Sequence, residues 1–125
     1  MSHLKTAIAA ALTLTLAACD QPKPSATPPK SNTPDPAIYR KKLLALKPEV
    51  RNDVLFKAIA SNNLACPSVE KSAYQEDYKD MSMWVVRCSV SGDWAVFVSG
   101  AGFAQVRQCS QEKQLGLPEC KASLL

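Results

Sequence analysis

Histidine is almost absent from this 125-residue sequence, which contains only His3. Imidazole is the commonest general base in enzymes and the base of most serine and cysteine triads. Because no residue after position 3 carries this side chain, such triads are excluded from the rest of the chain. Histidine is also the usual nitrogen ligand of zinc. The sequence therefore argues against an enzyme, and we expect no metal and no cofactor.

Long apolar runs are lacking as well. The longest uncharged apolar stretch, Ala7 to Ala18, is too short to cross a bilayer, which takes about 20 apolar residues. His3 and Lys5 precede it as a short positive segment. A basic segment followed by an apolar stretch of this length is typical of a secretory signal peptide.

Four residues at the end of this stretch, Leu16, Ala17, Ala18 and Cys19, resemble the lipobox of bacterial lipoproteins. The resemblance implies cleavage before Cys19, a diacylglycerol on its sulfur and a third acyl chain on its new amino group. Two acyl chains already anchor a protein stably, so three hold it on a membrane. The alternative is an ordinary secretory signal cut near Ala18, with Cys19 as a free thiol.

The implied anchor places the protein on a bacterial membrane, facing the periplasm. Asp20 follows the lipidated cysteine, and in enteric bacteria an aspartate there resembles a signal for retention in the inner membrane. Other bacteria read other positions, so inner and outer membrane both stay open. Loss of Lys5 with the signal lowers the formal charge from +4 to +3. So small a charge argues against nucleic acid as a partner.

Three segments follow along the chain: a signal peptide (1–18), a lipidated cysteine with a linker (19–36) and one small domain (37–125). The linker favours an extended polyproline spacer of roughly 3 Å per residue. Its prolines stand at positions 22, 24, 28, 29, 34 and 36. The 107 residues after the signal suffice for one domain only.

The exported domain contains four cysteines, Cys66, Cys88, Cys109 and Cys120. An even number in a small exported domain favours two disulfides over a metal site, and no C-x-x-C spacing is present. Sequence alone allows three pairings. We prefer Cys66 with Cys88 and Cys109 with Cys120, because Gly116 and Pro118 let the second loop turn back. Pairing of Cys88 with Cys109 is the main competitor.

Apolar spacing predicts helices over Ala37–Lys47, capped by Asp35 and Pro36, and over the segment from Pro48 to Asn62. Alternating valines and aromatics with glycine turns predict strands further on. These cover Met83–Val90, Trp94–Ser99 and Phe103–Cys109, with Ser68–Tyr78 as a fourth candidate. We therefore expect an α+β domain whose N-terminal helical pair packs on a three- to four-stranded antiparallel meander, stapled by disulfides. The two helices are the only cover that we expect for the apolar face of the sheet.

The tract from Trp84 to Cys109 resembles small exported bacterial domains of unknown function. It carries Val86-Arg87-Cys88, a glycine turn at Gly92, two valine-rich strands and a closing cysteine. The resemblance covers about a quarter of the chain. It implies a disulfide-stapled hairpin and no particular activity.

Several residues are weighed as sites. Carboxylates at Glu76, Asp77 and Asp80 could in principle serve hydrolysis, but such a run more often forms a solvated loop. Trp84 and Trp94 are core candidates, although an exposed one would suit a partner. Candidate contacts with anionic lipid or a partner are the cations Arg40, Lys41, Lys42, Lys47 and Arg51.

Two functions follow from these features. The first is a lipid-anchored binding or accessory protein of the cell envelope that docks on a membrane or secretion complex through a protein partner. The alternative is a periplasmic inhibitor or immunity protein against a hydrolase or toxin, whose rigid loop plugs an active site. Gly100–Gly102 and Gln111–Glu119 are the candidate plugs.

Overall fold

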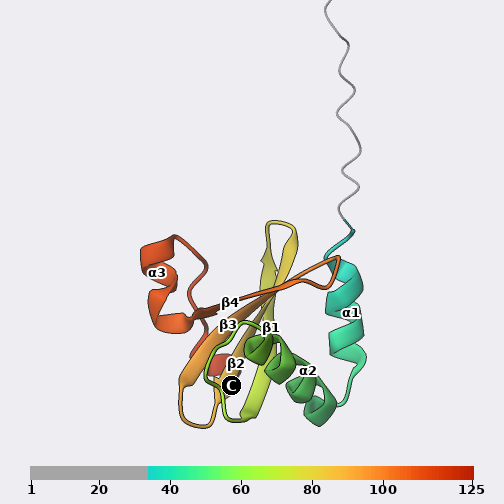
Figure 1. The fold of residues 1–125 in the computed structure, drawn as a ribbon. Coiled ribbons are helices and arrows are strands. Elements are labelled where there is room, and N and C mark those ends of the chain that lie inside the picture. Colours follow the sequence, from blue (N-terminus) through green and yellow to red (C-terminus); the bar gives the residue numbers. More distant parts are fainter. Residues whose placement is uncertain (1–33) are drawn as a thin grey trace, which may run out of the picture. The chain divides into compact units, whose positions relative to one another are not determined.

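Two helices begin the part of the chain that the computed structural model describes, residues 34–125 (Figure 1). They are α1 (Ala37–Ala45) and α2 (Pro48–Ser61), close to the segments expected. The signal peptide, Cys19 and the linker up to residue 33 lie outside the described residues. Between residues 34 and 125, no helix has the length and apolar character needed to span a membrane.

Local sequence sets the ends of both helices. The side chain of Asp35 accepts the N–H of Ala37 at 2.9 Å, which satisfies one of the free donors at the start of α1. Helix α1 ends at Ala45, two residues earlier than expected, because Leu46 and Lys47 are extended with ψ of 148°. A residue before proline disfavours the helical region. Pro48 then occupies the first position of α2, where its missing N–H has no consequence.

Four strands follow and form one antiparallel sheet in the order β1-β2-β3-β4. Their bounds are β1 Val69–Tyr78, β2 Met81–Cys88, β3 Gly92–Ser99 and β4 Ala104–Gln108. The order is that of a meander, as expected, and the fourth candidate strand is present as β1. The predicted α+β fold class is therefore confirmed.

Strand ends differ from the expected ones at the turns. Strand β2 starts at Met81 and ends at Cys88, two residues earlier at each end than expected. The reason is a tight β1–β2 connection in which Lys79 takes a positive φ of 52°. Lysine rarely adopts this conformation, so the sequence does not predict a turn this short. Strand β4 lacks the expected Phe103 and Cys109, because Cys109 begins a 3-10 turn, η1 (Cys109–Gln111).

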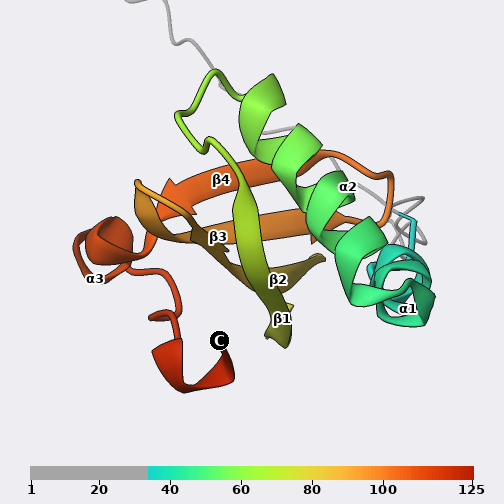
Figure 2. The ribbon, with the colours of Figure 1, turned by 90° about the horizontal axis from the view of Figure 1, so that it is seen from below.

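The main core lies between the two helices and one face of the sheet. Figure 2 shows α2 lying across this face. Leu43 of α1 and Leu55 and Ile59 of α2 are buried there. The sheet contributes two tryptophans, four valines and one cysteine, namely Trp84, Val86, Cys88, Trp94, Val96, Val98 and Val106. Both tryptophans are thus core residues rather than partner contacts.

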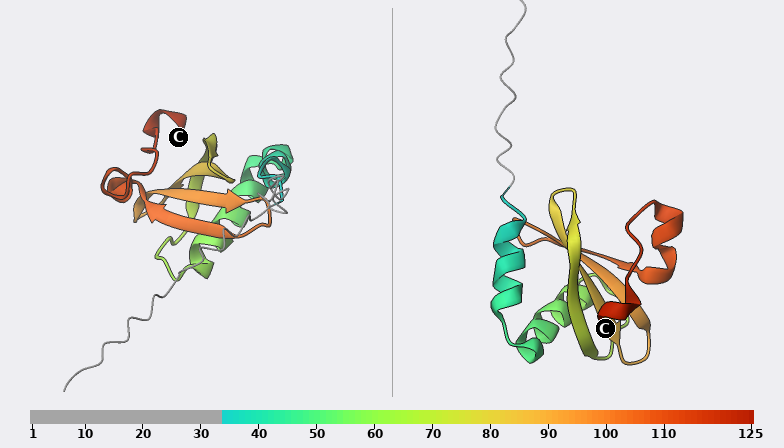
Figure 3. Two further views of the ribbon diagram at one scale, coloured as in Figure 1. Left: turned by 90° about the horizontal axis from the view of Figure 1, so that it is seen from above. Right: turned by 180° about the vertical axis from the view of Figure 1, so that it is seen from behind.

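The opposite face of the sheet is also apolar and covered. We expected only the two helices to cover the sheet, and this was wrong. Met83, Ala95 and Phe97 form a second cluster, against which Leu117 and Cys120 pack. The cover is the C-terminal segment, with α3 (Glu112–Leu115) and η2 (Ala122–Leu124). Figure 3 shows this segment and α2 on different sides of the sheet.

Candidate functional site

Two disulfides staple the domain, in the preferred pairing. Cys66 bonds Cys88 with a Cα–Cα distance of 5.4 Å, joining the segment after α2 to the end of β2. Cys109 bonds Cys120 with a Cα–Cα distance of 5.5 Å and closes a loop in the C-terminal segment. Because all four sulfurs are in disulfides, none is a free nucleophile or a thiolate ligand in this state.

The basic residues predicted as a contact surface divide into two groups. Arg40 forms an ion pair with Asp77 and lies 5.8 Å from the ring centroid of Tyr74. Arg51 bonds Ser72 Oγ at 3.2 Å and lies 5.8 Å from the ring of Trp84. These two arginines therefore tie the helices to the sheet. The exposed members are Lys41, Lys42 and Lys47, of which Lys42 lies 4.9 Å from the ring of Tyr39.

The acidic run that the sequence favoured as a loop lies mostly in strand β1. Glu76 and Asp77 are neighbours along this strand, so their side chains point to opposite faces of the sheet. Asp77 pairs with Arg40, and Glu76 lies 3.8 Å from Lys121 Nζ. Asp80 stands in the turn after the strand. The three carboxylates thus have separate surroundings and do not form a paired acid–base site.

The turn Gly100–Gly102, the first candidate plug, is held against the start of α1. A Cβ placed on Gly100 would lie 1.8 Å from the carbonyl oxygen of Pro34. Gly102 has a φ of +86°, and a Cβ there would lie 2.6 Å from the hydroxyl of Tyr39. Phe103 follows directly, with 77% of its surface exposed. The turn is therefore a supported loop that presents one aromatic side chain.

Replacing Gly100 by alanine is expected to lower the free energy of unfolding by about 1–3 kcal/mol, through overpacking. The methyl group would meet the backbone of Pro34 and Asp35, which must then move away from the turn. Urea unfolding followed by circular dichroism measures this loss. Ala101→Ser at the exposed neighbouring position is the control, and equal stability of the two variants would contradict the close contact.

An apolar groove with a volume of about 510 Å³ lies between α1, α2 and this turn. We call it the β4 groove, because Ala104 at the start of β4 forms one wall. Its exposed apolar members are Val54, which is 40% exposed, and Phe103. The other residues lining it are Tyr39, Leu43, Leu55, Lys57, Ala58, Ser61, Asn62, Val98 and Gly102.

The outer edge of β4 is open beside this groove. Ser99 N–H donates to Phe103 O at 2.9 Å, so these two residues form a hydrogen-bonded pair. Such pairs alternate along an antiparallel ladder, so the N–H groups of Ala104, Val106 and Gln108 point away from β3. Within residues 34–125, no strand lies on that side of β4. An open edge of this kind is a template for another strand.

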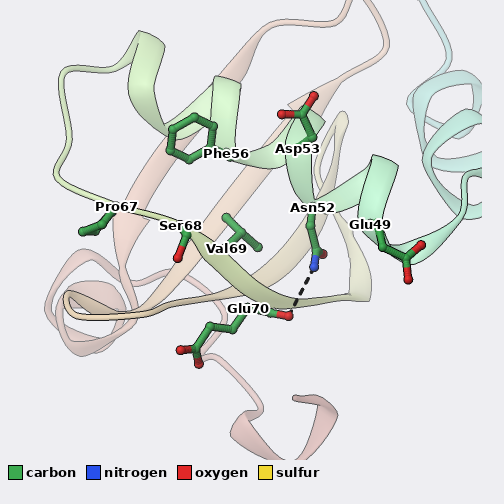
Figure 4. Close-up of a pocket in the computed structure, with 8 residues that line it drawn as sticks. All are labelled: Glu49, Asn52, Asp53, Phe56, Pro67, Ser68, Val69 and Glu70. Carbon is green, nitrogen blue, oxygen red and sulfur yellow. Dashed lines mark hydrogen bonds between the residues drawn. The ribbon is translucent and has the colours of Figure 1, made fainter.

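A second groove of about 490 Å³ separates α2 from β1 (Figure 4). Asn52 bridges its two walls, since its amide donates to Glu70 O at 3.2 Å and its Oδ1 accepts from Ser72 at 2.6 Å. Phe56, Pro67 and Val69 add apolar surface, and Ser68 also lines the groove. Its carboxylates are Glu49, Asp53 and Glu70, of which Asp53 binds Lys57 at 2.7 Å.

The second candidate plug, Gln111–Glu119, contains helix α3 and a buried acid. Glu112 is fully buried, and its Oε2 accepts the N–H of Cys120 at 2.6 Å. Its other oxygen, Oε1, is buried and has no hydrogen-bond partner among residues 34–125. The pKa of Glu112 is raised from 4.5 to about 7, mainly because burial disfavours the charged form. The hydrogen bond from Cys120 opposes this rise, and the charge of Glu119 adds to it. The carboxylate and the sulfurs of Cys109 and Cys120 all lie within 4.8 Å of one another.

Sequence reasoning missed Glu112 as a residue of interest. One signal was available, because Glu112 lies between two cysteines expected to pair, in a loop too short to leave it far from the bond. Its burial depends on the packing of the C-terminal segment over the sheet, which the sequence did not predict.

Comparison with known proteins adds no family, because no family model matches the sequence, no curated protein is significantly similar to it, and no solved structure matches it significantly.

Proposed function

We propose that this chain is a lipid-anchored binding protein of the bacterial cell envelope that docks on a membrane or secretion complex. The observation that carries the proposal is the β4 groove beside the open edge of β4. An edge strand offers backbone donors and acceptors, and the groove offers apolar surface next to them. Together they suit an extended segment of a protein partner that adds to the sheet as a fifth strand.

The partner segment has a defined chemistry. Its backbone pairs with the outward N–H groups of Ala104, Val106 and Gln108. It displaces the guanidinium of Arg107, which donates to Val106 O at 2.7 Å. Because side chains alternate along a strand, every second residue of the segment points toward the helix side of the sheet. There it meets Val54 and Ala58. The partner is therefore an extended segment with apolar residues at alternate positions.

The lipid anchor belongs to the same proposal. The lipobox at Leu16–Cys19 supports attachment to a membrane, and the proline-rich linker supports a spacer between the membrane and the domain. Contact with anionic headgroups is proposed only for the lysines Lys41, Lys42 and Lys47, since Arg40 and Arg51 bind the sheet. Inner and outer membrane are both compatible with this function.

The test is a crosslinked pull-down of the full lipidated protein from its own cells, with partners identified by mass spectrometry. Phe103→Ala is expected to reduce recovery of the partner about tenfold or more, as loss of an aromatic anchor does. Val90→Ala is the matched control, because Val90 is also apolar and is 82% exposed, but lies in the β2–β3 turn. Equal recovery with both variants, or no partner at all, would refute the proposal.

Proline at Gln108 tests the edge itself. Gln108 has a φ of −69°, which proline adopts, and its N–H faces away from β3, so no bond within the sheet is lost. Gln108→Pro is expected to retain the stability of the domain and to lose partner binding about tenfold or more. Unchanged binding by a folded Gln108→Pro variant would show that the partner does not use this edge.

The inhibitor or immunity protein is the second candidate, and one observation favours it. Gly100 and Gly102 pack so closely on Pro34 and Tyr39 that the turn holds Phe103 in a supported position, as a plug requires. Recovery of a single hydrolase or toxin in the pull-down, released by Phe103→Ala, would favour this function over the accessory protein.

A further inference from the structure

The two disulfides have different surroundings. Cys66 and Cys88 lie in the main core and are only 7% and 3% exposed. Cys109 and Cys120 are half-buried, and Cys120 packs against the second cluster. Since thiol–disulfide exchange requires an incoming thiolate to reach a sulfur, the second bond is the accessible one.

Glu112 lies beside the accessible bond and beside both of its sulfurs. One carboxylate oxygen is within 4.8 Å of Cys109 Sγ and of Cys120 Sγ, so the acid can serve whichever sulfur leaves. Oε2 is engaged by the N–H of Cys120, whereas Oε1 is buried and has no partner among residues 34–125. A buried polar atom without a partner is unusual in a folded domain and suggests a role beyond packing.

We propose that Cys109–Cys120 is a thiol–disulfide exchange site, that a dithiol is its co-reactant, and that Glu112 moves the protons. The proposal is independent of partner binding at the β4 groove. It concerns the opposite face of the sheet, where the C-terminal segment packs.

The first step forms a mixed disulfide. A thiolate of the dithiol attacks one protein sulfur, and the bond between Cys109 and Cys120 breaks. The electron pair of that bond goes to the leaving sulfur, which separates from its former partner. The neutral carboxyl of Glu112 gives its proton to this sulfur, leaving one cysteine thiol and an ionised Glu112.

The second step releases the oxidised co-reactant. Glu112 takes the proton of the second thiol of the dithiol, and the resulting thiolate attacks the mixed disulfide at the dithiol's own sulfur. The second cysteine leaves with the electron pair and takes this proton from Glu112. Glu112 then regains a proton from solvent, which balances the proton lost by the first thiol. The dithiol is oxidised by two electrons, and Cys109 and Cys120 are reduced by two.

The protonation state of Glu112 controls the first step. A neutral carboxyl donates to the developing thiolate, whereas an ionised one repels it. The pKa of Glu112 near 7 places this change within an ordinary pH range. Among the described residues, Glu119 is the charged group that shifts the pKa of Glu112, and its negative charge favours the neutral form of that carboxyl.

Reduction of Cys109–Cys120 would leave the C-terminal segment held against the sheet only by noncovalent contacts. Gln75 of β1 donates to Glu119 O at 3.0 Å and accepts the N–H of Lys121 at 2.8 Å. Leu117 packs on the second cluster. We therefore expect faster hydrogen exchange in this segment after reduction, with little change around Cys66–Cys88.

The experiment treats the full-length protein with dithiothreitol, blocks free thiols with iodoacetamide at time points and identifies each opened bond by peptide mass spectrometry. Cys109–Cys120 is expected to open at least about tenfold faster than Cys66–Cys88. Its rate constant, divided by the thiolate fraction of the reagent, is expected to fall about tenfold from about pH 6 to about pH 8.5.

Glu112→Gln tests the proton transfer, because glutamine retains the carbonyl that accepts the Cys120 N–H but carries no acidic proton. This variant is expected to open about tenfold more slowly near pH 6 and to lose the fall with pH. Glu119→Gln is the matched control and is expected to keep a fall, displaced to lower pH.

Three results would overturn the proposal. They are equal opening of the two disulfides, a wild-type rate constant that does not change with pH, and a Glu112→Gln variant that keeps the wild-type profile. Circular dichroism and the protection of Cys66–Cys88 show whether the variant is folded. If it is not, the wild-type pH profile alone decides the outcome.

Discussion

Replacing Trp84 by alanine is expected to lower the free energy of unfolding by about 3–5 kcal/mol. Trp84 is fully buried in the main core, where Arg51 covers its ring. Its ring stands edge-on to Tyr74 at 5.6 Å, and its Nε1 donates to Ser82 Oγ at 3.1 Å. The variant would lose the packing, leave a cavity and leave Ser82 without this bond. Since small domains have only about 5–15 kcal/mol of stability, this loss removes a large fraction of it.

Urea unfolding followed by far-ultraviolet circular dichroism measures this loss without depending on tryptophan fluorescence. Trp84→Phe should give an intermediate loss, because it keeps an aromatic ring but not the donor to Ser82. Val90→Ala, on the exposed β2–β3 turn, should change stability by less than about 0.5 kcal/mol. A loss below about 1 kcal/mol for Trp84→Ala would contradict the packing at the centre of this core.

The stability of the domain is expected to fall as pH rises from about 4.5 to about 7, through Glu112. Its pKa is about 7 in the folded protein, against 4.5 for an ordinary glutamate, because burial disfavours the charged form. Between these values the folded state holds a proton that the unfolded state has released, so raising the pH favours unfolding. The contribution of neutral Glu112 to stability is fully present below pH 4.5 and is lost by about pH 7. At 1.36 kcal/mol per pKa unit, the loss is at most about 3 kcal/mol.

Urea unfolding across this pH range measures the slope, with the disulfides intact. Glu112→Gln, which is neutral at every pH, should remove the fall and be the more stable protein above pH 7. Glu119→Gln should shift the fall to lower pH, because the charge of Glu119 raises the pKa of Glu112. If the wild-type protein and Glu112→Gln had parallel profiles, the raised pKa would be wrong.

Helices and strands were predictable where a local cause acts. Asp35 caps α1, Pro48 begins α2, and glycine stands at the turns on both sides of β3. Short-range backbone preferences of these residue types set where the helices begin and where the chain turns, so one sequence is enough to predict them. The turn at Lys79 was missed because a lysine with a positive φ is unusual, and only the paired strands stabilise it.

The candidate sites were less predictable, because each depends on which segments meet. The predicted cationic surface mixed two kinds of residue, and only the fold shows that Arg40 and Arg51 bind the sheet. The turn Gly100–Gly102 was predicted as a rigid plug, and only the fold shows that Pro34 and Tyr39 support it. Contacts between residues tens of positions apart have no local signal in one sequence.

The sequence by itself determined the α+β class, the order of the two N-terminal helices and the strands, and the meander, because short-range preferences and loop lengths control them. It left three cysteine pairings open, and the structure contains the preferred one. Only the tertiary structure decided what covers each face of the sheet. Strands β2 and β3 have apolar residues on both faces of the sheet. No local sequence pattern predicts that the C-terminal segment buries one of these two faces. The same long-range packing buries Glu112 beside Cys109–Cys120 and leaves the edge of β4 open, and burial and pairing of this kind are properties of the assembled fold.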